Sequence, residues 1–229
     1  MTLTLYSHPL ASFCHKVLIA LYENATPFTN HLVDLGNPGE RAKFLDIWPV
    51  GKMPVLRDDD RDATIPETSI IIEYLDQHYF RSAPMFPADP AQRLDTRLWD
   101  RFFDLYVQEP LQKIVIDRLR PEGAKDPSGV LEARQRLQTA YRVVDRRMAD
   151  RTWAIGGQFT LADCAAAPAL FYASIVAPFP ADHHHLGAYF ERLLARPSFR
   201  RTLNEARPYF GLFPFKDQMP ARFLSNADI

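Results

Sequence analysis

The chain has 229 residues, of which 47% are apolar, so it is long enough for two modest domains with hydrophobic cores. Its 27 basic and 28 acidic side chains nearly cancel, which excludes a strong field for nucleic acid or an anionic membrane surface. The sequence contains neither a membrane-length apolar run nor a secretory signal pattern. The two cysteines, Cys14 and Cys164, fit a reducing compartment, so we expect a cytoplasmic protein without nucleic-acid or membrane partners.

The first 80 residues alternate short β-rich runs with helical patterns. The predicted strands are 2–6, 28–33, a run that begins after Pro54, and 63–65, and the predicted helices are 13–23, 38–47 and 67–79. The order βαβ, α, ββα predicts an α/β thioredoxin-like domain. In its last helix we expect Ile70, Ile71, Tyr74 and Leu75 to form one buried face.

A proline-rich stretch follows, and the rest of the chain has helical periodicity. Pro84, Pro87 and Pro90 favour an extended linker, because proline cannot continue a helix. The helices predicted beyond it are 91–120, 129–150, 160–176, 183–195 and 198–206, and residues 216–229 are predicted to be loosely held. Thr160 and Asp163 form a candidate capping box with a structural role. The predicted organisation is a thioredoxin-like domain at 1–80, a linker at 81–89 and an all-helical bundle at 90–229.

Three segments of the first domain indicate a site for a thiol peptide. Residues 7–15 join the first strand to the first helix, and a helix N-terminus stabilises an anionic sulfur. Met53-Pro54 precedes a strand and is a candidate cis peptide, which would turn the Met53 backbone toward an extended ligand. Glu67 and Thr68 begin a helix after Pro66, an arrangement suited to an α-amino and α-carboxylate pair.

Four motifs in order, LYSHPLASFCHKVLIAL, WPVGKMPVL, PETSIIIEYLD and FTLAD, resemble the glutathione S-transferases over residues 3–205. The resemblance implies that Met53, beside Pro54, pairs with the cysteinyl part of glutathione. It also implies that Glu67 and Thr68 hold the γ-glutamyl end and that Lys52 lies near the glycyl carboxylate. A further implication is a homodimer in which the first domain of one subunit contacts the helical domain of the other.

The residue that would activate the thiol departs from the family pattern. The family position falls near Ala11, which has neither hydroxyl nor thiol, so we predict that the next residue, Ser12, donates its hydroxyl to the thiolate. The alternative is that Ser12 only caps the helix. Cys14, His15 and Tyr6 remain other candidates for a direct role.

Aromatic residues indicate where an acceptor substrate would bind. The helix at 91–120 and the C-terminal segment ARPYFGLFPF are rich in aromatic side chains. The residues predicted to form an apolar acceptor pocket are Phe103, Tyr106, Val107, Tyr209 and Phe210. The alternative is that most of them belong to the core of the bundle.

We expect no metal ion. Three consecutive histidines, His183, His184 and His185, would point in different directions from a helix start and cannot share one ion. The leading hypothesis is therefore a transferase that uses glutathione as co-substrate and conjugates it to a small apolar electrophile. Two alternatives stay open: a glutathione-dependent thiol reductase or peroxidase that uses Cys14, and a non-catalytic binding module of the same fold.

Overall fold

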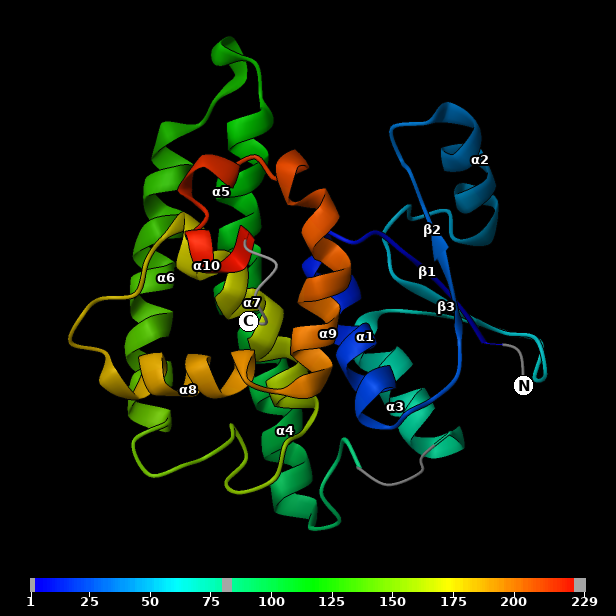
Figure 1. Ribbon diagram of the computed structural model, residues 1–229, viewed down its shortest axis with the longest axis horizontal. Coiled ribbons are helices and arrows are strands. Elements are labelled where there is room, and N and C mark those ends of the chain that lie inside the picture. Colours follow the sequence, from blue (N-terminus) through cyan, green and yellow to red (C-terminus); the bar gives the residue numbers. More distant parts are fainter. Residues whose placement is uncertain (1–2, 80–83, 225–229) are drawn as a thin grey trace.

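The structure is a computed structural model that describes residues 3–79 and 84–224 (Figure 1). A four-stranded sheet is formed by β1 (Leu3–Ser7), β2 (Thr29–Leu32), β3 (Val55–Asp58) and β4 (Ala63–Pro66), in the order β2-β1-β3-β4. β1 pairs in parallel with β2 and antiparallel with β3, and β3 pairs antiparallel with β4. With α1 (Ser12–Glu23), α2 (Pro38–Ile47) and α3 (Thr68–His78), this sheet confirms the predicted thioredoxin-like fold.

The two faces of the sheet are covered differently. Helices α1 and α3 lie between the sheet and the helical domain (Figure 1), while Phe44 of α2 packs with Val33 and Val55 in a separate small cluster. Burial alternates along β1, where Leu3 and Leu5 point into the main core. The junction of β1 with α1 therefore lies at the boundary between the two domains.

The buried face of α3 differs from the prediction by one position. Ile71, Ile72 and Leu75 are buried, whereas Ile70 is 55% exposed. Three isoleucines in a row give two possible phases for the apolar stripe, and the contact of α3 with α1 selects the later one.

The second domain is helical. Its elements are α4 (Pro90–Phe102), the π-helical segment η1 (Phe103–Gln108), α5 (Glu109–Leu119), α6 (Pro127–Arg147), α7 (Leu161–Val176), α8 (His184–Leu194), α9 (Pro197–Ala206) and α10 (Ala221–Leu224), with short 3₁₀ helices at Glu122–Ala124, Arg207–Leu212 and Lys216–Gln218. The single helix predicted at 91–120 is thus three segments, because η1 interrupts it. Helix α7 is the centre of the bundle, since every side chain in it except that of Ser174 is buried. Within residues 3–79 and 84–224, no helix is long and apolar enough to cross a membrane.

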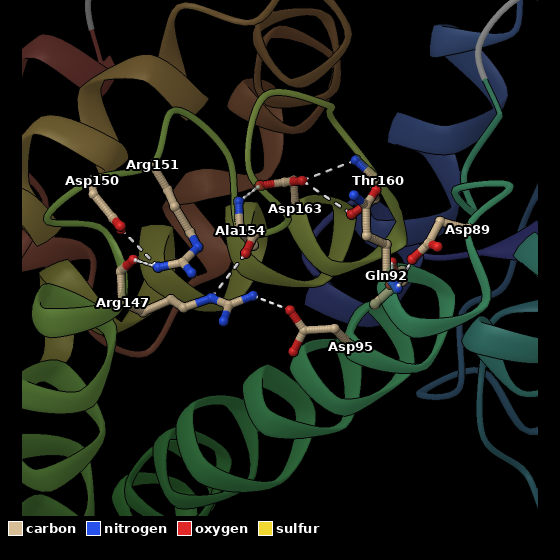
Figure 2. Close-up of polar contacts among 10 residues, drawn as sticks. Asp89, Gln92, Asp95, Arg147, Asp150, Arg151, Ala154, Thr160 and Asp163 are labelled. Atoms are coloured by element: carbon tan, nitrogen blue, oxygen red, sulfur yellow. Dashed lines mark hydrogen bonds and ion pairs between the residues drawn. The ribbon is translucent and has the colours of Figure 1, made fainter.

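The predicted capping box starts α7 and also organises the loop before it (Figure 2). Asp163 accepts hydrogen bonds from the Thr160 amide at 2.9 Å and the Ala154 amide at 2.8 Å. It also accepts one from the Tyr189 hydroxyl of α8 at 2.6 Å. Arg147 of α6 donates to the Ala154 carbonyl and pairs with Asp95 of α4, so the same loop is tied to two further helices. The structural role predicted for the box is confirmed.

The C-terminal segment is more ordered than predicted. Phe223 of α10 is fully buried and packs edge-on against Phe171 of α7, with ring centroids 4.9 Å apart. Phe215 and Met219 are also buried. The prediction of a loosely held tail is therefore wrong for residues 216–224, because a few apolar side chains anchor a mostly polar segment; residues 225–229 lie outside the described residues.

Candidate functional site

Two cavities adjoin where the two domains meet. The first, here called the α3 cavity, has a volume of about 680 Å³ and is lined by the start of α3 and by α4 and η1. The second, the α5 cavity, has a volume of about 560 Å³ and lies between the β1–α1 junction and helices α5 and α7. Phe13, Lys52, Met53 and Gln112 line both. The arrangement offers two compartments with one common wall.

The α3 cavity brings together the residues predicted to hold glutathione. Lys52, Met53, Pro54, Glu67 and Thr68 all line it, and the Met53–Pro54 peptide is cis, as predicted. Glu67 has φ 67° and ψ 118°, a conformation that residues other than glycine rarely adopt. Such outliers cluster at ligand-binding sites, where the surrounding structure holds them in place. Here the strained residue immediately precedes the free amides at the start of α3.

A buried ionic cluster borders this cavity and was missed by the sequence analysis. The ammonium of Lys16 lies 2.6 Å from Asp100 Oδ1 and 2.8 Å from Asp104 Oδ2, and it donates to Ser69 Oγ at 3.1 Å. Ser69 in turn donates to Asp100 Oδ2 at 2.7 Å. The available signal was a lysine inside the apolar run of α1, together with two aspartates four residues apart on one face of the next domain's first helix.

The charges in this cluster do not balance, since one ammonium faces two carboxylates. Burial raises the pKa of Asp104, although the nearby Lys16 acts to lower it. For Lys16, burial acts to lower the pKa, but Asp100 and Asp104 outweigh it and the pKa is raised. The side of the α3 cavity formed by Ser69, Asp100 and Asp104 is therefore suited to a cationic ligand group.

Ser12 is placed at the other compartment. It is the first residue of α1, is 8% exposed and lines the α5 cavity. The preceding Ala11 occupies the N-cap position with an extended backbone and makes no side-chain cap hydrogen bond. The first turn of α1 therefore has unpaired amides and one nearby hydroxyl.

The other candidate activators lie away from both cavities. Cys14 is fully buried, and burial raises the pKa of its thiol to about 12, so it supplies no thiolate near neutral pH. Burial lowers the pKa of His15 to about 4, and its Nε2 lies 2.5 Å from the Pro9 carbonyl. Tyr6 packs against Phe44 on the α2 side of the sheet.

The five residues predicted for the acceptor pocket are not brought together. Phe103 and Val107 are fully buried, and Phe210 stacks on Phe171 in the core. Tyr106 is 55% exposed and lines a cavity beside α6, while Tyr209 lines one beside α9. A count of aromatic residues does not say which face of a helix meets the core and which meets a cavity.

The apolar wall of the α5 cavity comes from other residues. Leu111 and Val115 of α5 are spaced by one helical turn and share a face with Gln108 and Gln112. Tyr172 of α7 and Phe213 complete this wall. Leu111 and Val115 were within reach of sequence analysis, because residues 108, 111, 112 and 115 follow helical spacing.

His8, on the opposite wall of the α5 cavity, was also missed. It directly follows β1, which ends at Ser7, and its Nδ1 accepts a hydrogen bond from the Leu10 amide at 3.2 Å. Its ring meets the edge of Tyr209 at a centroid distance of 6.2 Å. Burial lowers the pKa of His8, although Asp34 acts to raise it.

Within the described ranges, no group of three or more His, Cys, Asp or Glu side chains is arranged to hold a metal ion. His183 precedes α8, and His184 and His185 begin it.

Comparisons with known proteins agree with this geometry. A model of the glutathione S-transferase N-terminal domain matches residues 5–83, and a model of the glutathione S-transferase C-terminal domain matches residues 102–197. A glutathione S-transferase-like protein LUC7 of Fusarium sp is 33% identical over 174 residues, covering 74% of this chain and 76% of its own length. A stringent starvation protein A homolog of Coxiella burnetii is 28% identical over 207 residues, covering 89% of this chain and 92% of its own.

The solved structures include a glutathione S-transferase from Methylobacillus flagellatus with glutathione bound. It superimposes with a TM-score of 0.79 at 25% sequence identity, over 87% of this chain and 98% of its own. The two domain models, the Fusarium relative and this solved structure all carry the name glutathione S-transferase. The chain belongs to the glutathione S-transferase family.

Proposed function

We propose that this protein is a glutathione transferase that holds reduced glutathione in the α3 cavity and conjugates it to a small electrophile in the α5 cavity. The observation that carries the proposal is the common wall of the two cavities, because a thiol held beside Met53 lies within reach of both. The two cysteines of the chain are free and buried, which fits a cytoplasmic location.

The α3 cavity supports the assignment of glutathione's charged ends. The free amides and the Thr68 hydroxyl at the start of α3 suit the γ-glutamyl carboxylate. Glu67 and the carboxylates of Asp100 and Asp104 suit its ammonium group, which would balance the excess negative charge there. Lys52 suits the glycyl carboxylate, and the Met53 backbone suits the cysteinyl part.

Activation of the thiol is assigned to Ser12 and the first turn of α1. A thiol with an unperturbed pKa of about 8.5 is mostly protonated at pH 7, and a lower pKa raises the thiolate fraction. The Ser12 hydroxyl donates a hydrogen bond to the sulfur, and the unpaired amides of the turn favour the anion. The thiolate sulfur then attacks the electrophile, which the apolar wall of Leu111, Val115 and Phe213 holds in place.

The first test is isothermal titration of the protein with reduced glutathione. We expect binding by the wild type, a large loss with Glu67→Ala, and unchanged binding with Glu132→Ala, which removes an exposed carboxylate on α6. Absence of binding by the wild type would refute the proposal.

A second candidate function is a non-catalytic binding module of the same fold. Ala11, without hydroxyl or thiol at the N-cap of α1, favours it, as does a relative named for stringent starvation rather than for transfer. Glutathione binding without conjugation of any tested electrophile would support this candidate over the transferase.

We also propose a homodimer. Leu94 and Leu98, one turn apart on α4, are 69% and 61% exposed, and Ile70 of α3 and Tyr106 of η1 are each 55% exposed. So much exposed apolar surface on adjacent elements indicates a protein contact. Light scattering after size exclusion should give twice the 26.3 kDa of one chain; a value of 26.3 kDa would contradict the dimer.

A further inference from the structure

A tight turn separates His8 from Ser12. The Ala11 amide donates to the His8 carbonyl at 3.0 Å, which closes the chain between β1 and α1. His8 begins this turn and Ser12 follows it directly, and both line the α5 cavity. An electrophile bound in this cavity therefore lies in a compartment that both residues line.

The hydrogen bonding of the ring fixes its tautomer. Because the Leu10 amide donates to Nδ1, that nitrogen is unprotonated and the proton of the neutral ring is on Nε2. The neighbours that face the ring are Asp34 from the loop after β2, His15 from α1 and the edge of Tyr209. Burial is the largest influence on the ring, and it favours the uncharged form because it lowers the pKa of His8. The result is a neutral N–H donor at the wall of the cavity.

We propose that the Nε2–H of His8 donates a hydrogen bond to the negative charge that develops on the acceptor substrate, which makes His8 a second catalytic residue. The inference rests on the proposed transferase function. A preorganised donor of this kind stabilises an anion more strongly than water does, because it needs no reorientation during the reaction.

The electron balance of the step is simple. The thiolate sulfur forms a bond to the electrophilic carbon, and an electron pair of the substrate moves onto its electron-withdrawing oxygen atoms, where His8 donates. In an aryl halide the pair then returns to the ring, the carbon–halogen bond breaks, and halide leaves. In an α,β-unsaturated carbonyl compound the enolate takes up a proton from water.

This donor selects a class of substrate. Electrophiles that carry a nitro or carbonyl oxygen conjugated to the reacting carbon place charge on that oxygen and use the hydrogen bond. Simple alkyl halides have no such oxygen. His8 should therefore matter for activated aryl halides and unsaturated carbonyl compounds and be dispensable for simple alkyl halides.

The test is the anionic adduct that glutathione forms with 1,3,5-trinitrobenzene, which has no leaving group and therefore stops at the charged intermediate. Its visible absorbance is measured on the wild type, His8→Gln, His8→Phe and the control His185→Phe, which makes the same change on an exposed residue of α8. Glutathione binding is measured for each by calorimetry.

We expect His8→Phe to lower the formation constant of the bound adduct about a hundred- to a thousandfold, as removal of one donor does in other anion-stabilising sites. His8→Gln, whose amide nitrogen can take the place of Nε2, should restore much of it, and His185→Phe should match the wild type. If His8→Phe does not fold, His8→Asn replaces it, because its amide is too short to reach the same position.

Equal adduct formation by the wild type and His8→Phe, with glutathione bound by both, overturns the role of His8 and leaves the transferase function standing. A wild type that binds no glutathione refutes the transferase function itself. The two failures are therefore distinguishable.

Discussion

The ammonium group of Lys16 lies 2.6 Å from a carboxylate oxygen of Asp100, and neither side chain is more than 2% exposed. Lys16 belongs to the thioredoxin-like domain and Asp100 to α4 of the helical domain. The two domains are thus joined by an ion pair inside a continuous core as well as by apolar packing. Charges at such a depth stabilise the protein only while each keeps its partner.

Replacement of Lys16 by Met should therefore destabilise the protein strongly. The variant leaves Asp100 and Asp104 buried without the ammonium that contacts both, and we expect a loss of about 3 to 5 kcal/mol in the free energy of unfolding, measured in urea. Lys43→Met, which removes a lysine that is 76% exposed, should change it by less than about 1 kcal/mol. Adding Asp104→Asn to Lys16→Met should return part of the loss; no return would contradict the charge argument.

Asp163→Asn should lower stability because the carboxylate accepts hydrogen bonds on both oxygens. An amide nitrogen in place of one oxygen leaves buried donors of Thr160 or Ala154 without an acceptor. We expect a loss of about 2 to 4 kcal/mol at pH 7, with Asp150→Asn on the surface as the matched control.

The same variant should show a defined pH dependence. Burial raises the pKa of Asp163 to about 6, above its ordinary value of 3.8. Between these values the folded protein binds a proton that the unfolded chain does not, so this group's contribution to stability falls as pH rises. The difference in the free energy of unfolding between wild type and Asp163→Asn should therefore be larger at pH 4 than at pH 7, by roughly 2 to 3 kcal/mol. A smaller difference at pH 4 than at pH 7 would contradict this prediction.

Neither thiol of the native chain should react. Burial raises the pKa of Cys14 to about 12 and that of Cys164 well above its usual range. A chromogenic disulfide reagent should therefore label no cysteine in the native protein and both cysteines after unfolding. Rapid labelling of native Cys14, or a glutathionyl adduct on it, would revive the thiol reductase alternative.

Ser12→Ala should raise the pKa of bound glutathione's thiol by about one unit, because the thiolate loses a hydrogen bond. Conjugation should then fall about tenfold at pH 6.5 and much less at pH 9, where the thiol ionises without help. The ultraviolet absorbance of the thiolate measures the shift directly. Ser128→Ala, at an exposed site in the first turn of α6, is the control. An unchanged thiol pKa would mean that Ser12 does not contact the sulfur and has only a structural role at the start of α1.

The fold was predictable from the sequence because most of its signals are local. Each of these signals involves only a few neighbouring residues: the alternation in β1, the proline at the start of α2 and the capping box of α7. The π-helical segment η1 was not predictable, since its apolar residues continue the helical pattern of α4 and α5. The burial of Phe223 was not predictable either, because one apolar side chain in a polar segment has no periodic pattern.

The candidate site also has a part that local sequence motifs predict and a part that they do not. Lys52, Met53, Glu67 and Thr68 belong to short motifs, and the structure brings them to one cavity. The acceptor wall depends on how α5 packs against α7, and this contact between distant segments decides that Val115 lines a cavity while Phe103 lies in the core. The positive φ of Glu67 also depends on tertiary context, because glutamate has no intrinsic preference for it.

The common wall of the two cavities has a consequence for how this protein can change during evolution. Substitutions at Leu111, Val115 or Phe213 alter one compartment only, so new acceptors can be sampled while the affinity for the co-substrate is kept. Substitutions at Phe13 or Met53 alter both compartments at once. Substitutions that change the range of acceptors should therefore concentrate in the helical domain. Residues of the thioredoxin-like domain that line both cavities should vary less.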